Sequence, residues 1–347
     1  MIKIGRTNDS ESALLAYPGV GYFDQNRWRL RVAGVAWQTP VVLSMRKRMM
    51  IRMLGGVMQA SPDDLEGETF RSRITPFMAD ADHRKSLIIT IGSQSHRLRR
   101  KTKRNGHFAG WLTLDDSVIQ SNIQNEGNGQ TISFQAVIDG LEETRTEGKI
   151  FLFKPGGTSV ISDIDDTIKD SAVGDRRELL ANTFLREFRS IEGMSELYQQ
   201  WAVKGIGFHY VSSSPWQLFD SLTGLQDNLG FPTGTMHLRN FRLRDQLLKR
   251  VIIRREGKTL AIRQLIKQMP GRRFVLIGDS GEKDPKIYRK ICRKHPDQIK
   301  AVLIRDLPHK PMDQERLGKL KGALKNGICE KFSDANELAA LTKDLFV

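Results

Sequence analysis

The sequence lacks most features of a secreted or membrane-spanning protein. Only two cysteines, Cys292 and Cys329, occur among 347 residues, too few for a disulfide framework, and neither has a neighbouring cysteine with which to hold zinc. No apolar run approaches the roughly 18 residues that a membrane-spanning helix needs. Residues 1–22 carry charged side chains such as Asp9 and Glu11 where a signal peptide would be apolar. We therefore expect a cytoplasmic protein with no transmembrane segment.

The composition also lacks the bias of a disordered or low-complexity chain. Hydrophobic residues make up 39% and charged residues 27%, ordinary values for a globular protein, and 347 residues are enough for two domains. Acidic residues are in deficit, because 55 Lys and Arg face 40 Asp and Glu and leave a net charge of +15. This excess favours an anionic partner, which can be a phosphorylated substrate, an acidic membrane surface or nucleic acid, and charge alone does not choose among them.

Two kinds of pattern divide the chain at about Phe153. Before this point, short alternating or β-rich stretches predict a small antiparallel sheet domain over residues 1–153, with a helical insertion near 44–59. Over residues 154–310 apolar strands alternate with helices, which predicts an α/β domain with a parallel sheet. We predict that residues 311–347 form a C-terminal helical extension of one or two helices that packs on this domain. The strands predicted in the α/β domain are 159–162, 207–211, 273–277 and 300–304, and its predicted helices are 177–204, 216–229, 258–268 and 285–293.

The most informative segment is an apolar strand that runs into a pair of carboxylates. It reads Val160-Ile-Ser-Asp163-Ile-Asp165-Asp166-Thr167. Ligands of an open parallel sheet bind beyond the carboxyl ends of its strands, and an acidic pair there can hold a hard cation and place a nucleophile beside it. The structural alternative is a capped turn before a helix, with Asp165 or Thr167 as the N-cap.

Three further elements follow in order along the chain. The predicted strand 207–211 runs into three serines, residues 212–214, whose hydroxyls can bind a phosphoryl oxygen but which are also common helix caps. Lys258 begins a helix-like stretch, where a solvated surface charge is the alternative. The predicted strand 273–277 opens into Gly278-Asp279, and Asp284 follows five residues later, a pattern in which carboxylates converge on a metal.

In this order the four elements resemble the signature motifs of the haloacid dehalogenase superfamily, namely Asp-x-Asp-x-Thr, a strand ending in Ser or Thr, a Lys, and Gly-Asp followed by another Asp. More narrowly, the runs at 162–167, 177–184, 210–216 and 278–288 resemble the actin-patch-associated phosphatidate phosphatase family and its bacterial relatives, over about residues 159–307. The resemblance implies a Rossmann-like haloacid dehalogenase core preceded by the β-rich domain. Core helices account for most of the intervals between motifs, so we expect only a minimal cap.

The resemblance also implies roles for the acidic residues. Asp163 would be the nucleophile, with its carboxylate on Mg²⁺, and Asp165 would act as general acid and then base while lending a backbone carbonyl to the metal. Asp279 would complete the protein ligands of Mg²⁺, and Asp284 would orient the metal shell or Lys258. The neighbouring Asp166 is not at a required position, and we interpret it as a supporting or exposed residue.

Two other residues would handle the phosphate. Lys258, together with Mg²⁺, would offset the charge of the phosphate and of the attacking carboxylate. Ser212 would hold a phosphoryl oxygen that is not transferred. Because three serines follow one another, the sequence does not decide which of them occupies this position of the motif, and Ser213 is the alternative. We favour Ser212 because it comes first after the apolar strand.

The resemblance implies phosphatidate as the substrate, cleaved to diacylglycerol and phosphate, which makes a phospholipid at an anionic membrane surface the expected partner. Another phosphoester or a phosphoprotein is the alternative substrate, and a binding module with a dead site is the alternative from a different class. Seven basic residues crowd the stretch from Arg239 to Arg255 and would suit peripheral association with an anionic membrane. Nucleic acid is not expected but would fit the same charges, and a solvated basic face is the structural alternative.

Overall fold

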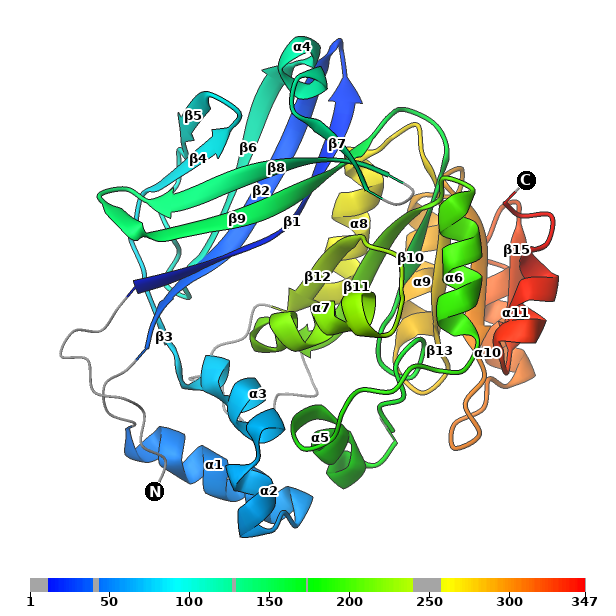
Figure 1. Ribbon diagram of the computed structural model, residues 1–347. Coiled ribbons are helices and arrows are strands. Elements are labelled where there is room, and N and C mark those ends of the chain that lie inside the picture. The colour runs from blue at the N-terminus through cyan, green and yellow to red at the C-terminus, as the bar shows by residue number, and fades with distance from the viewer. Residues whose placement is uncertain (1–11, 40–43, 127–128, 173, 240–256, 347) are drawn as a thin grey trace. The chain divides into compact units, whose positions relative to one another are not determined.

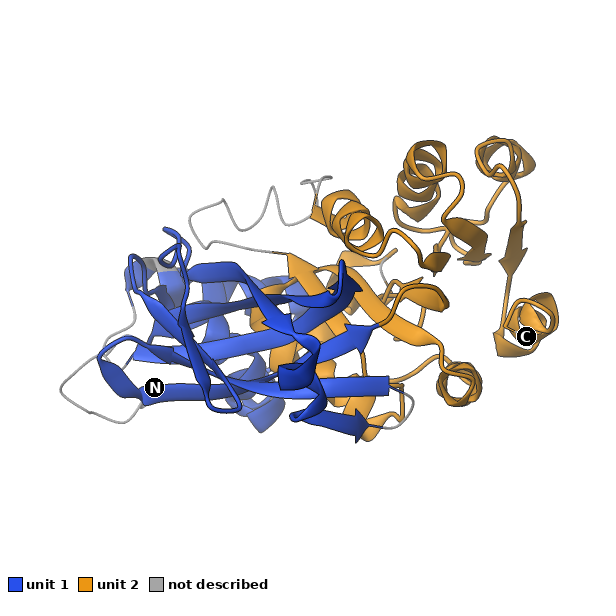
Figure 2. Ribbon diagram, turned by 90° about the horizontal axis from the view of Figure 1, so that it is seen from above, with its two compact units in different colours: residues 1–153, 240–252 blue, residues 154–239, 253–347 orange. Residues whose placement is uncertain are grey.

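The computed structural model of the chain describes residues 12–39, 44–126, 129–172, 174–239 and 257–346. Contacts divide these residues into two compact units, with unit 1 ending at Phe153 and unit 2 holding the described residues from Lys154 onward (Figure 2). The predicted mixed α/β class with a parallel sheet is confirmed. Among the helices described, none combines the length and the apolar character that crossing a membrane requires.

Unit 1 is built around a nine-stranded sheet (Figure 1). Its main path runs β3-β2-β1-β9-β8-β4-β5, while β6 pairs with β2 and β7 pairs with β8. All pairs are antiparallel except β1 with β9. Burial alternates along β2, where Trp28, Leu30 and Val32 are buried and Arg27 and Arg29 are exposed, as expected for a strand with one face on a core. The strands are β1 (Ser12–Asp24), β2 (Arg27–Gln38), β3 (Asp80–Ala81), β4 (Leu87–Ile91), β5 (Gln94–Arg97), β6 (His107–Asp115), β7 (Ile123–Glu126), β8 (Gly129–Ile138) and β9 (Leu141–Phe153).

A group of helices interrupts the strands of unit 1 where the sequence predicts a helical insertion. The Ser44 side chain accepts a hydrogen bond from the Lys47 amide and caps the start of the first helix, which ends before Gln59. Pro62 begins the next helix, whose start is closed by a capping box between Ser61 and Asp64. The helices are α1 (Met45–Met58), α2 (Pro62–Glu66), α3 (Glu68–Met78) and, later in the chain, α4 (Asp116–Gln120).

Unit 2 contains a six-stranded sheet in which every pair of neighbours is parallel. The order is β12-β11-β10-β13-β14-β15, so the chain builds outward from β10 in one direction and then from β13 in the other, as in a doubly wound sheet. The central strands β10 and β13 are buried on both faces, which explains the continuous apolar run Phe274–Ile277 of β13. The strands are β10 (Thr158–Ser162), β11 (Gly207–Pro215), β12 (Thr235–Arg239), β13 (Arg273–Asp279), β14 (Ile299–Arg305) and β15 (Ile328–Phe332).

Helices cover both faces of this sheet (Figure 2). On one face, α8 packs against β11 and β12, α9 packs against β13 and β14, and α10 lies beside α9. On the other face α6 and α11 contact each other. The helices are α5 (Arg176–Phe184), α6 (Met194–Val203), the 3-10 turn η1 (Trp216–Leu218), α7 (Phe219–Asn228), α8 (Gly257–Gln268), α9 (Asp284–Lys294), α10 (Gln314–Lys321) and α11 (Ala335–Thr342).

Two predictions for this unit were wrong in detail. The single helix predicted over 177–204 is two helices, α5 and α6, and Gly193 precedes α6 with a φ of 75°, a left-handed conformation that glycine adopts at little cost. The tail predicted as wholly helical also contributes β15, which pairs with β14 between α10 and α11. Only Cys329 and Phe332 of its five residues are buried, and Glu330 and Lys331 lie between them, so it lacks the apolar run that marks the central strand β13.

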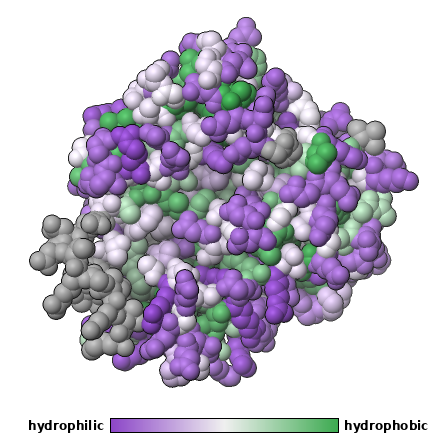
Figure 3. Space-filling view, viewed as in Figure 1, coloured by the Kyte–Doolittle hydropathy of each residue, from purple (hydrophilic) through white to green (hydrophobic). Residues whose placement is uncertain are grey.

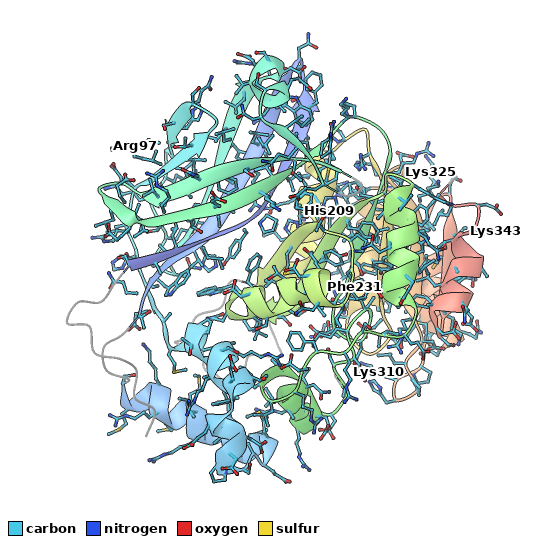
Figure 4. All side chains as sticks on the ribbon, in the orientation of Figure 1. Arg97, His209, Phe231, Lys310, Lys325 and Lys343 are labelled. Atoms are coloured by element: carbon cyan, nitrogen blue, oxygen red, sulfur yellow. The ribbon has the colours of Figure 1, made fainter. Side chains whose placement is uncertain are left out.

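A buried histidine in β11 should make unit 2 sensitive to acid. His209, labelled in Figure 4, is fully buried, with its Nδ1 2.7 Å from the Thr235 hydroxyl, which lies 2.9 Å from His237 Nε2. Burial first, and then the nearby His237 and Arg272, hold the pKa of His209 well below its ordinary value of 6.5. Below pH 6.5 the unfolded chain therefore binds a proton that the folded chain does not.

We expect the free energy of unfolding of unit 2 to fall as the pH drops below 6.5, by up to about 1.4 kcal/mol per pH unit from this group. Urea denaturation at a series of pH values, compared between the parent chain and His209→Asn, measures this contribution as the difference between the two proteins. The variant should be less stable at neutral pH but lose less stability on acidification. Parallel pH dependences in the two proteins would assign the acid sensitivity to other groups.

Candidate active site

The predicted motif residues come together at the carboxyl edge of the unit 2 sheet. Asp163 directly follows β10 and Asp279 ends β13, and these neighbouring strands are the two from which the chain builds outward in opposite directions. A crevice at such a switch point is where doubly wound sheets bind ligands. Lys258 comes from the first turn of α8, and Asp284 begins α9.

Four carboxylates form a cluster at this edge, which we call the carboxylate cluster. Asp163, Asp279, Glu282 and Asp284 each offer an oxygen, and these oxygens all lie within 4.8 Å of one another. Three of the side chains are almost completely buried, and Glu282 is partly exposed. The Oδ2 atoms of Asp163 and Asp279 have no hydrogen-bond partner among the described residues, which is costly for buried oxygens. An all-oxygen set with unpartnered buried atoms fits a hard divalent cation such as Mg²⁺.

Lys258 is the cation that the structure places in the cluster. Its Nζ lies 2.8 Å from Asp163 Oδ1, 2.5 Å from Asp284 Oδ1 and 3.9 Å from Glu282 Oε2. Burial works against the charge on Lys258, but Asp163 and Asp284 outweigh it and hold the pKa of the ammonium well above its ordinary value. One ammonium therefore faces four carboxyl groups.

This imbalance is reflected in the acidities of the cluster. Burial raises the pKa of Asp163 well above its ordinary value, against the lowering effect of Lys258. Burial also raises the pKa of Asp279 to about 6, with Asp284 adding to the shift, and that of Glu282 to about 7, where Lys258 opposes the change. A divalent cation bound at the cluster would favour the ionised form of all three.

The carboxylate of Asp284 lies close against the backbone of Gly278. A Cβ atom on Gly278 would lie 2.1 Å from Asp284 Oδ2 and 2.8 Å from the Tyr288 hydroxyl, so only glycine fits at this position. The Tyr288 hydroxyl donates to the Ile277 carbonyl at 2.8 Å, which ties α9 to the end of β13. The Gly-Asp sequence thus brings two carboxylates from different elements to one point.

Asp165 was predicted to join the metal site, but its carboxylate lies outside the carboxylate cluster. Its Oδ1 accepts hydrogen bonds from Lys169 Nζ at 2.9 Å and from the Ser171 hydroxyl at 2.7 Å. Its Oδ2 accepts from the hydroxyls of Ser212 at 3.1 Å and Ser214 at 2.9 Å. Burial opposes ionisation, but Lys169 and the serine hydroxyls outweigh it and lower the pKa of Asp165 strongly. The side chain is therefore a fixed carboxylate beside the cluster, and any contact with a metal through its backbone carbonyl stays a prediction.

The triple serine is divided between buried and exposed positions. Ser212 is 3% exposed and, besides donating to Asp165, accepts a hydrogen bond from the Ser214 amide at 2.9 Å. Ser213 is exposed. Ser212 is thus the serine beside the catalytic candidates, while its predicted contact with phosphate stays a prediction.

Asp166 is not exposed, contrary to one of our two interpretations. It is 4% exposed, has a φ of 51°, and its Oδ1 accepts the amides of Ser171 at 2.8 Å and Ala172 at 2.9 Å. Its carbonyl accepts a hydrogen bond from Arg305 at 2.9 Å. Asp166 therefore folds the loop that brings Lys169 and Ser171 back onto Asp165.

The basic stretch predicted to meet an anionic surface falls almost entirely outside the described residues. Only Arg239, the last residue of β12, is described, and residues 240–256 are not. The role of this stretch stays a prediction.

Glu282 was not predicted, and its place in the carboxylate cluster gives it a measurable role. We expect Glu282→Gln to weaken Mg²⁺ binding by roughly tenfold, because the change removes one of four converging carboxylates. Isothermal titration of the substrate-free protein measures the affinity, with Glu315→Gln, a change at an exposed carboxylate of α10, as the matched control. Unchanged affinity in Glu282→Gln would remove this residue from the metal site.

Comparison with known proteins connects this geometry to a family. Residues 158–306 match the family described as "Phosphatidate phosphatase APP1, catalytic domain". "Phosphatidate phosphatase APP1" of Saccharomyces cerevisiae is 35% identical over 156 residues, which cover 44% of this chain and 26% of that protein. "Uncharacterized protein C29B5.04c" of Schizosaccharomyces pombe is 32% identical over 156 residues, which cover 44% of this chain and 25% of that protein. The chain thus matches about a quarter of the length of these relatives.

A solved structure of an uncharacterized protein from Listeria monocytogenes serotype 4b covers 54% of this chain and 99% of that chain, at 14% identity and a TM-score of 0.35, a likeness too weak to carry an argument. The family match, in contrast, spans the strands from β10 to β14 and contains the whole carboxylate cluster, Lys258 and Asp165. Residues 158–306 of this chain are therefore similar to the catalytic domain of the phosphatidate phosphatase APP1 family.

Proposed function

We propose that this chain is a Mg²⁺-dependent phosphatidate phosphatase that hydrolyses phosphatidate to diacylglycerol and phosphate through a phosphoaspartyl intermediate on Asp163. The observation that carries this proposal is the different hydrogen bonding of two carboxylates, those of Asp163 and Asp165. Asp163 has an oxygen with no hydrogen-bond partner among the described residues, whereas Asp165 is held on both oxygens by its neighbours. The first is suited to attack and the second to proton transfer at a fixed position.

The strand order and the strand-end carboxylates also support assignment to the haloacid dehalogenase superfamily, as the motif resemblance implies. Asp163, Asp279 and Glu282 are the residues that would hold Mg²⁺, since Asp284 is engaged by Lys258 at 2.5 Å. When bound, Mg²⁺ would offset the negative charges of the phosphate and of the carboxylates, which otherwise repel each other. We place Asp284 as the residue that orients Lys258.

In the first step, a carboxylate oxygen of Asp163 attacks phosphorus, and the bond from phosphorus to the glycerol oxygen breaks. Lys258, 2.8 Å from Asp163 Oδ1, favours the ionised form of the attacking group and attracts the incoming phosphate. The leaving oxygen needs a proton, and Asp165 is ionised in the free protein. We propose that Asp165 takes a proton as the phosphate monoester binds and passes it to the leaving oxygen.

In the second step, Asp165, again a carboxylate, removes a proton from water, and the resulting hydroxide attacks phosphorus. The bond from phosphorus to Asp163 breaks, the departing phosphate takes the proton from Asp165, and both carboxylates are restored. Lys169 and Ser171 hold the Asp165 carboxylate in place during both steps, and Ser212 lies on its other side, where it can contact a phosphoryl oxygen.

A substrate panel tests this proposal. Phosphate release from phosphatidate, lysophosphatidate, a phosphoprotein and a nucleoside monophosphate is measured in mixed micelles with and without Mg²⁺. We expect phosphatidate to be turned over with the largest kcat/KM and EDTA to abolish turnover. Preference for the phosphoprotein or the nucleotide would reassign the substrate, and the absence of Mg²⁺-dependent turnover of every substrate would favour a binding module with a dead site.

A further inference from the structure

Helix α1 of unit 1 exposes an unusual set of apolar side chains. In the part of the chain that the structure describes, six large hydrophobic side chains are exposed, and three of them are Met45, Met49 and Met53, with exposed fractions of 77%, 54% and 37%. They lie four residues apart and so form one stripe on the helix surface. On the face drawn in Figure 3, by comparison, hydrophilic residues predominate and hydrophobic ones are scattered among them.

The exposed stripe is not the side by which α1 packs on the protein. Met50, Leu54 and Met58 are 4%, 8% and 3% exposed and form a second stripe. Met58 follows Met49 by nine residues, about two and a half helical turns, which places the two stripes on opposite sides of the helix. The packing of α1 on the protein therefore explains the apolar residues of the buried stripe but not those of the exposed stripe.

Positive charge lies beside the exposed stripe. Arg48 follows Met45 by three residues and Arg52 follows Met49 by three, so each arginine lies next to a methionine on the surface. Both arginines are exposed, and neither forms an ion pair with another described residue. Helix α1 has no acidic residue, and its buried Lys47 already pairs with Asp80 at 2.8 Å.

The acidic residues nearest to α1 in the sequence follow its C-terminal end. Asp63 and Asp64 lie in α2, which approaches α1 at Gly55, where a Leu65 methyl would be 3.0 Å from an added Cβ. Asp64 is also engaged in the capping box with Ser61. The first two turns of α1 therefore present methionine and arginine together.

We propose that the exposed face of α1, formed by Met45, Arg48, Met49, Arg52 and Met53, binds the surface of an anionic lipid bilayer. The unbranched, flexible methionine side chains enter the boundary between headgroups and acyl chains, and the arginines meet the lipid phosphates. This inference rests on the proposed function in one respect, since a phosphatidate phosphatase meets its substrate in such a bilayer. The net charge of +15 favours the same surface.

Sedimentation with vesicles tests the binding without involving the active site. Vesicles of phosphatidylcholine alone are compared with vesicles that also contain phosphatidylserine, whose phosphodiester is not a substrate for a monoester phosphatase. We expect the parent chain to bind the anionic vesicles more strongly, and Met45→Ser, Met49→Ser and Met53→Ser together to weaken that binding by about tenfold or more. Changing Arg48 and Arg52 to Gln should weaken it several-fold and reduce its sensitivity to salt.

Matched controls come from exposed residues elsewhere. Val203→Ser with Leu260→Ser removes two exposed apolar side chains, and Arg99→Gln with Arg100→Gln removes two exposed charges, so both pairs should bind vesicles like the parent. All variants should hydrolyse p-nitrophenyl phosphate at the parent rate. Equal binding by the parent and the methionine variant, or no binding of anionic vesicles by the parent, would overturn the proposal.

A second measurement needs no variant and so does not depend on how a variant folds. Dilute peroxide converts exposed methionines to sulfoxides, which mass spectrometry locates by residue. We expect anionic vesicles to slow the oxidation of Met45 and Met49 several-fold. Equal oxidation rates with and without vesicles would overturn the docking. Slowed oxidation in a chain that does not hydrolyse phosphatidate would instead retain the docking and reject the proposed substrate.

Discussion

Replacing Asp163 by asparagine should reduce phosphatase activity by at least about a thousand-fold, because the amide has nearly the same shape but cannot attack phosphorus as a carboxylate does. The fold should persist. Asp163 is 1% exposed among three other carboxyl groups and one ammonium, and its buried charge is disfavoured. We therefore expect the melting temperature without Mg²⁺ to be equal to that of the parent or higher.

Phosphate release from phosphatidate and from p-nitrophenyl phosphate, together with calorimetry in EDTA, measures both effects. The matched control is Asp170→Asn, which changes an exposed carboxylate seven residues along the same loop and should leave both properties near the parent values. Activity of Asp163→Asn near the parent level would reject the nucleophile. A large fall in melting temperature would show that the carboxylate supports the fold instead.

Replacing Asp165 by asparagine should slow phosphatidate hydrolysis by about a hundred-fold to ten-thousand-fold, the usual contribution of a general acid and base. The glycerol oxygen of phosphatidate is a poor leaving group and needs a proton, whereas p-nitrophenolate does not. We therefore expect the variant to form phosphoenzyme from p-nitrophenyl phosphate in a burst and then to hydrolyse it slowly. Rapid-quench measurement of p-nitrophenol and of phosphate separates the two steps.

The split between substrates distinguishes proton transfer from a structural role. Asp165 joins Lys169, Ser171, Ser212 and Ser214, so a merely structural loss would slow both substrates and both steps alike. Equal losses for both substrates, with no burst, would remove Asp165 from the chemistry.

The sequence predicted those parts of unit 2 whose pattern reflects burial. Strands β10 and β13 are buried on both faces and therefore read as apolar runs that end in Asp163 and Asp279. The two edge strands, β12 and β15, carry polar and charged residues at partly exposed positions, so their sequences do not differ from those of loops. Their pairing depends on the neighbouring strands, which the local sequence does not encode.

The candidate site was predictable where its residues follow strands and not where a turn creates the contact. Asp163, Lys258, Asp279 and Asp284 were found through motif order, and the structure brings them together. Lys169 was missed because its contact with Asp165 depends on the left-handed backbone of Asp166.

Glu282 was missed for a similar reason. Its amide donates to Asp279 Oδ1 at 2.6 Å, and this turn carries the side chain back toward the carboxylate cluster. A carboxylate three residues after Asp279 is a weak signal by itself, because a solvated loop residue has the same sequence pattern.

Locating the covalent intermediate tests the central claim most directly. The Asp165→Asn variant, which should accumulate phosphoenzyme, is quenched in acid during turnover of p-nitrophenyl phosphate with Mg²⁺ and reduced with borohydride, which converts a phosphorylated aspartate to homoserine. Mass spectrometry of the peptide that follows β10 then identifies the modified residue. We expect homoserine at position 163 and an unmodified Asp166. Modification at another residue, or an unmodified Asp163 in a sample that shows a burst of p-nitrophenol, would contradict a phosphoaspartyl mechanism at this site.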